Sequence, residues 1–66
     1  MVNIKKLGER MRKTREKLGI TQEEAAYRAD LDYSYYNQIE MGKRNPSIKA
    51  LSRIARAIGI PLKNLF

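Results

Sequence analysis

The chain contains no cysteine and no histidine among its 66 residues. Without cysteine it can form no disulfide and no thiolate metal site. Without histidine it lacks the commonest metal ligand and the commonest general base. The sequence also has no glycine-rich phosphate loop and no paired carboxylates on a pocket-forming scaffold. We therefore expect a protein that is not an enzyme and that has no catalytic residue, metal site, cofactor or small-molecule ligand.

Long apolar runs are absent as well. No run approaches the roughly 18 residues that a membrane-spanning helix needs. Lys5 and Lys6 near the N-terminus are not followed by the apolar core of a signal peptide. There is no linker, internal repeat or low-complexity tract. Residues 1–66 are therefore predicted to form a single cytoplasmic domain that does not contact membranes.

Acidic residues are absent after Glu40. The chain has 14 lysines and arginines against 7 aspartates and glutamates, a net charge of +7, and an isoelectric point near 10.1. Such a surplus favours binding to polyanions, because cationic side chains release the counterions that surround them. A basic surface also serves solubility alone. Charge by itself therefore leaves both nucleic-acid binding and a merely solvated surface open.

Apolar residues recur at helical spacing and predict an all-α fold of five helices with no strand. The first helix runs from about Ile4 to Leu18, with Ile4, Leu7, Met11 and Leu18 on one stripe, and Gly19 ends it. A later helix starts at Pro46-Ser47 and stops at Gly59. Its inward stripe is Ile48, Leu51, Ile54, Ala55 and Ile58. Pro61 then starts a short fifth helix, 62–66.

Between these helices the sequence predicts two short helices joined by a tight turn. The first opens at Thr21, which forms a capping-box pattern with Glu24. Its inward face is small, because it consists of Ala25, Ala26 and Ala29. The turn is Asp30-Leu31, and aspartate is one of the few residues other than glycine that tolerates a left-handed backbone. Asp32 is then the N-cap of the next helix.

That next helix, from Tyr33 to about Met41, has an unusual outward face. Tyr36 and Ile39 point inward, and Gly42 ends the helix. A helix-turn-helix protein inserts this kind of helix into the major groove. Asparagine or glutamine can bond an adenine edge there, serine can bond several base edges, and a tyrosine ring can pack on a thymine methyl. The alternative is a polar face turned to solvent. The candidates for base reading are Tyr33, Ser34, Asn37 and Gln38.

The whole chain resembles the phage-repressor (XRE-type) helix-turn-helix family. Five landmarks carry the resemblance: Thr21-Gln22-Glu23-Glu24-x-Ala26, then Leu31, Ile39-Glu40-x-Gly42, Asn45-Pro46-Ser47 and Ala57-Ile58-Gly59-Ile60-Pro61. Within the family, Ala26-Tyr27-Arg28-x-x-Leu31-Asp32-x-Ser34-Tyr35 looks most like the controller proteins of restriction–modification systems. The resemblance implies a homodimer that binds a near-palindromic site in double-stranded DNA and regulates transcription as a repressor or controller.

The resemblance also implies roles for single residues. Gln22 is expected to contact the DNA backbone at the start of its helix, where N–H groups attract phosphate. Arg15 and Glu40 are expected to form a structural ion pair that joins the first helix to the end of the recognition helix. The chain departs from the family pattern at Ala25, where Tyr27 or Tyr36 fills the space, and at Asp30. The predicted phosphate contacts are Gln22, Tyr35, Lys43, Arg44 and Asn45.

The C-terminal end is crowded with apolar residues. A 66-residue domain buries only about 60% of its unfolded surface, and dimerisation is one way to bury more. We expect a two-fold dimer core. A rival hypothesis is an antitoxin-type module that binds a partner protein and contacts DNA only secondarily. The residues predicted for the dimer interface are Ile60, Leu62, Leu65 and Phe66.

Overall fold

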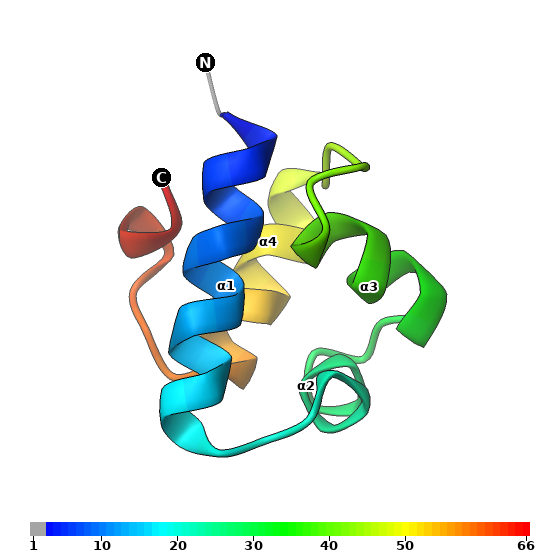
Figure 1. Cartoon of the computed structure of the whole chain (residues 1–66), viewed down its shortest axis with the longest axis vertical. Coiled ribbons are helices and arrows are strands. Elements are labelled where there is room, and N and C mark those ends of the chain that lie inside the picture. Colours follow the sequence, from blue (N-terminus) through cyan, green and yellow to red (C-terminus); the bar gives the residue numbers. More distant parts are fainter. Residues whose placement is uncertain (1–2) are drawn as a thin grey trace.

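The computed structural model describes residues 3–66, which fold into four α-helices and one short 3-10 helix. The elements are α1 (Ile4–Leu18), α2 (Gln22–Arg28), α3 (Tyr33–Glu40), α4 (Ile48–Ala57) and η1 (Leu62–Leu65). α2 and α3 lie on one side of α1, and η1 lies on the other (Figure 1). This part of the chain contains no strand, so the all-helical prediction is confirmed. None of its helices is long and apolar enough to cross a membrane.

The last element differs from the prediction of five α-helices, because η1 is a 3-10 turn. The Asn64 N–H donates to the Pro61 carbonyl at 2.9 Å, and the Phe66 N–H donates to the Lys63 carbonyl at 3.3 Å. Both bonds join residues three apart, which is the 3-10 spacing. A segment of four residues is too short to establish a series of four-apart bonds. The prediction of a fifth α-helix is therefore wrong.

Side-chain caps start every α-helix, at Asn3, Thr21, Asp32 and Ser47. The Thr21 hydroxyl accepts from the Glu24 N–H at 3.0 Å, as predicted. The reciprocal half of the predicted capping box is missing, because the Glu24 carboxylate accepts from Arg28 Nε at 2.9 Å instead. One capping bond and one exposed ion pair along the helix therefore stabilise α2.

The turn between α2 and α3 has the predicted left-handed residue. Asp30 has a φ of 56°, and it is the only residue besides glycine with a positive φ in 3–66. The Leu31 N–H then donates to the Ala26 carbonyl at 3.0 Å, which closes the end of α2. Asp32 caps α3 by accepting from the Tyr35 N–H at 3.3 Å. This sequence of turn and cap fixes the direction in which α3 leaves α2.

The core combines large side chains with small ones. Ala25, Ala26 and Ala29 are buried, and the small face of α2 packs against α3 and α4. Tyr36 is fully buried, whereas Tyr27 is 83% exposed, so of the two tyrosines only Tyr36 enters the core. The other fully buried large residues are Leu7, Met11, Ile39, Ile54, Ile58 and Leu65.

Two residues predicted on inward stripes lie outside the core. Leu18 is 49% exposed and Ile48 is 64% exposed. Leu18 is the last residue of α1, and Ile48 is the first residue of α4. A periodic stripe extends to the end of a helix, but the neighbouring helices do not reach that far. These two core assignments are therefore wrong.

α1 and α3 approach each other closely at Gly8. A Cβ atom at this position would lie 2.3 Å from the Glu40 carbonyl oxygen and 2.9 Å from the Ile39 carbonyl oxygen. Such distances are shorter than any real carbon–oxygen contact, so only glycine fits here without movement of the helices. Gly8 therefore sets the distance between α1 and the C-terminal end of α3.

Candidate nucleic-acid interface

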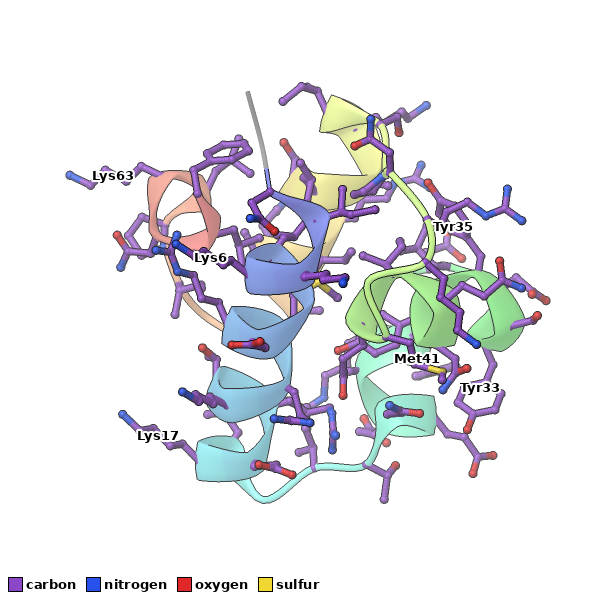
Figure 2. The ribbon with its side chains drawn as sticks, turned by 45° about the horizontal axis from the view of Figure 1, so that its top comes forward. Lys6, Lys17, Tyr33, Tyr35, Met41 and Lys63 are labelled. Carbon is purple, nitrogen blue, oxygen red and sulfur yellow. The ribbon has the colours of Figure 1, made fainter. Side chains whose placement is uncertain are left out.

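α3 has one buried face and one accessible face. Tyr36, Ile39 and Glu40 are buried beneath it. Figure 2 shows Tyr33 and Tyr35 on the α3 side of the molecule, away from Lys6 and Lys63. The four residues predicted to read bases all retain exposure, and their role in reading stays a prediction. Of these, Tyr33 and Ser34 are exposed, and Asn37 and Gln38 are half-buried.

A bidentate ion pair joins α1 to the last residue of α3. Arg15 Nη2 lies 2.8 Å from Glu40 Oε1, and Arg15 Nε lies 3.0 Å from Glu40 Oε2. The exposed fractions of the two side chains are 11% and 1%. Arg15 Nη1 also donates to the Ile20 carbonyl at 2.8 Å, so the same guanidinium holds the loop before α2. The predicted ion pair is therefore present, and it ties together α1, the loop and the recognition helix.

Gln22 extends this network from Glu40 to the accessible face of α3. Its Nε2 donates to Glu40 Oε1 at 3.0 Å. Its Oε1 accepts from Asn37 Nδ2 at 2.8 Å and from the Tyr33 hydroxyl at 3.4 Å. Sequence reasoning predicted Gln22 only as a phosphate contact and missed these bonds. The side chain is a bridge between a buried ion pair and two of the candidate base-reading residues.

A second contact lies at the other side of the accessible face. Arg44 Nε donates to Gln38 Oε1 at 3.0 Å. The Arg44 guanidinium carbon lies 5.6 Å from the centre of the Tyr35 ring, within the range of a cation–π interaction. The loop after α3 therefore places the Arg44 guanidinium against the surface of α3. Lys43, Arg44 and Asn45 are all exposed, and their predicted contact with phosphate remains a prediction.

The C-terminal residues predicted to form a dimer interface divide into two groups. Leu65 is fully buried within the monomer, so its side chain offers no surface to a second copy, and its assignment to the interface is wrong. The 3-10 geometry of η1 turns this residue inward against the core. Ile60 and Leu62 are half-buried, and Phe66 is exposed. Of the four predicted residues, only those three therefore have surface to offer a second copy.

The Arg15–Glu40 pair also makes stability depend on pH. Burial raises the pKa of Glu40, but hydrogen bonds from Arg15 and Gln22 outweigh it, so the pKa lies below its ordinary value of 4.5. Burial raises the pKa of the neighbouring Tyr36 hydroxyl, which therefore stays protonated. A carboxylate with a lowered pKa in the folded state contributes stability above its unfolded pKa. This contribution is lost as the pH falls through the folded pKa.

We expect Glu40→Gln to reduce the loss of stability in acid. Urea unfolding of both proteins at pH values from about 7 to 2 measures the effect. The difference in unfolding free energy between wild type and variant is expected to be constant above about pH 5 and to shrink below pH 4.5. Below that pH only the wild type takes up a proton at this site when it unfolds. If the two curves of unfolding free energy against pH stay parallel across the whole range, unfolding does not change the protonation of Glu40.

Comparison with known proteins agrees with this geometry. Residues 11–65 match the family described as "Helix-turn-helix". The chain is 44% identical over 62 residues to control protein C.MunI from Mycoplasma sp, covering 92% of this chain and 84% of that protein. It is 37% identical to control protein C.BamHI from Bacillus amyloliquefaciens, covering 96% and 80%.

Solved structures agree as well. The crystal structure of the restriction–modification controller protein C.AhdI from Aeromonas hydrophila superposes with a TM-score of 0.92 at 36% identity, and 96% of each chain is covered. The family match, the two relatives and this structure together cover α1 through η1. The chain therefore belongs to the helix-turn-helix family of DNA-binding regulators.

Proposed function

We propose that this protein is a sequence-specific transcriptional regulator that binds a near-palindromic operator as a homodimer in the cytoplasm. One observation carries the proposal: the polar accessible face of α3 is held in place by the Arg15–Glu40–Gln22 network. A merely solvated face does not require this support. The relatives named as control proteins and the solved restriction–modification controller protein C.AhdI favour a controller.

In this proposal α3 enters the major groove and the flanking segments hold the phosphates. Tyr33, Ser34, Asn37 and Gln38 face the base edges. The N-terminus of α2 and the loop of Lys43, Arg44 and Asn45 contact the backbone on either side of the groove, since helix N-termini and cations both attract phosphate. The two recognition helices of a dimer would lie about 34 Å apart, one turn of DNA. Base reading is therefore assigned to α3, and phosphate binding is assigned to the segments on either side of it.

Binding-site selection from random duplexes tests the proposal. We expect enrichment of a near-palindromic sequence, and an affinity for that site that falls steeply as salt increases. Gln38→Ala should weaken binding to the selected site by about 1–3 kcal/mol and change binding to random DNA less. Asn64→Ala, which removes an exposed amide on η1, is the matched control and should leave the selected sequence unchanged. Failure to enrich any sequence would contradict the proposal.

The dimer is tested separately through Phe66. Its exposed aromatic ring and the half-buried Ile60 line the same surface hollow at the C-terminal end. Burying such a ring between two copies would contribute about 1.5–3 kcal/mol per copy. We expect sedimentation at micromolar concentration to give twice the 7.7 kDa chain mass for the wild type and a lower mass for Phe66→Asp. A wild-type species of 7.7 kDa at that concentration would exclude the dimer.

A further inference from the structure

The amides of Asn37 and Gln38 are both held with a fixed polarity. A free asparagine or glutamine amide can rotate by half a turn and present either its oxygen or its NH2 group. That freedom lets the side chain meet either an acceptor or a donor on a base edge. Each of these two side chains is instead bonded to a neighbour whose own role as donor or acceptor is fixed. The partner therefore decides which end of the amide is free.

Gln38 is oriented by Arg44. A guanidinium has only N–H donors and no acceptor, so the group that faces it must be the Gln38 oxygen. Arg44 Nε lies 3.0 Å from that oxygen. The Tyr35 ring holds the guanidinium from one side, with 5.6 Å between the guanidinium carbon and the ring centre. The free end of Gln38 is therefore its NH2 group, a donor.

Asn37 is oriented by a longer chain that begins at Arg15. The Arg15 guanidinium only donates, and the Glu40 carboxylate that pairs with it only accepts. Gln22 must therefore turn its NH2 group to Glu40, at 3.0 Å, which leaves its oxygen to face α3. That oxygen accepts from the Asn37 NH2 group at 2.8 Å. The free end of Asn37 is therefore its oxygen, an acceptor.

From this geometry we infer that α3 reads two base edges of opposite chemistry, with Gln38 selecting bases that present an acceptor, and so rejecting cytosine, and with Asn37 selecting amino bases. In the major groove guanine, thymine and adenine present the acceptors O6, O4 and N7, which suit the Gln38 donor, whereas cytosine presents only a donor. Adenine and cytosine present the amino donors N6 and N4, which suit the Asn37 acceptor. Two donors, or two acceptors, that face each other would both lack a hydrogen-bond partner. This cost disfavours bases of the wrong class. The inference rests on the proposed function, because it assigns chemistry to the same helix.

Two pairs of variants test the inference by binding-site selection. Arg44→Met frees the Gln38 amide, and the matched control Lys43→Met removes the same charge from a neighbouring side chain that has no hydrogen bond to Gln38. Both should weaken binding to all sequences. Only Arg44→Met should relax the exclusion of cytosine at one position of each half-site, because a free amide can also turn its oxygen to the N4 amino group.

The second pair addresses Asn37. Gln22→Met breaks the chain from Glu40, and Glu23→Gln is the control at the adjacent exposed position. Only Gln22→Met should relax the amino-base preference at one position of each half-site.

A measurement on the unmodified protein gives the same information without a variant. Replacing the selected adenine by purine, or the selected cytosine by 2-pyrimidinone, removes the amino donor and should weaken binding about tenfold.

The outcomes separate the inference from the proposed function. If the wild type enriches no sequence, the proposed function fails and the inference fails with it. If the wild type enriches a sequence but Arg44→Met and Lys43→Met select the same bases, the polarity of Gln38 does not determine reading. If removing the amino group weakens binding at none of the adenines and cytosines of the site, Asn37 does not select amino bases. A changed base preference confined to Arg44→Met and Gln22→Met would support the inference.

Discussion

Replacing Gly8 with alanine is expected to lower the free energy of unfolding by about 3 kcal/mol. The new Cβ atom would lie 2.3 Å from the Glu40 carbonyl oxygen, which belongs to the backbone and cannot rotate away. α1 and α3 must therefore separate. The higher helix propensity of alanine would recover only about 1 kcal/mol. A domain of 66 residues has about 3–10 kcal/mol of stability in total, so the loss is a large part of it.

The control for this prediction is Gly19→Ala. Nothing lies within 4 Å of a Cβ atom at Gly19, but its φ of 72° is left-handed. Alanine there should cost about 1–2 kcal/mol through backbone strain alone. Urea denaturation of the two variants compares a steric clash with a backbone effect. If Gly8→Ala were more stable than wild type, as expected for an exposed glycine within a helix, the close approach of α1 and α3 would be incorrect.

The sequence carried enough information for the helices because their signals are local. Thr21, Asp32 and Ser47 cap the helices predicted from them, and Asp30 adopts the left-handed turn conformation. Leu18, Ile48 and Leu65 were misassigned for a different reason. Whether a residue at the end of a helix is covered depends on how far its neighbours extend, and a periodic pattern contains no such information.

The candidate site was predictable to a similar depth. Helical periodicity separated the outward residues of α3 from Tyr36 and Ile39. The Arg15–Glu40 pair followed from resemblance to a family and not from spacing, since 25 residues separate its members. The bonds of Gln22 depend on the distance between α2 and α3, which only the folded chain fixes. Gly8 had a visible signal, because a glycine within a predicted helix lowers the stability of that helix and so calls for a packing explanation.

Arg15→Met is expected to lower the free energy of unfolding by about 3–5 kcal/mol, because it leaves the Glu40 carboxylate buried without its partner. The Glu40 side chain is only 1% exposed, so water cannot replace the lost guanidinium. The bond from Arg15 to the Ile20 carbonyl is lost as well. Thermal and urea unfolding, followed by circular dichroism, measure the change.

The exposed pair of Glu24 and Arg28 provides the matched control. Its N–O distance of 2.9 Å is almost the same as in the buried pair, but both side chains are 45% exposed. Arg28→Met should therefore cost only about 0.3–0.5 kcal/mol. A double variant, Arg15→Met with Glu40→Leu, should recover much of the stability lost by Arg15→Met, since no buried charge remains. Because it also removes the acceptor that orients Gln22, this double variant should fold and yet lose the amino-base preference at Asn37. Equal losses for Arg15→Met and Arg28→Met would show that burial of Glu40 does not determine the strength of the pair.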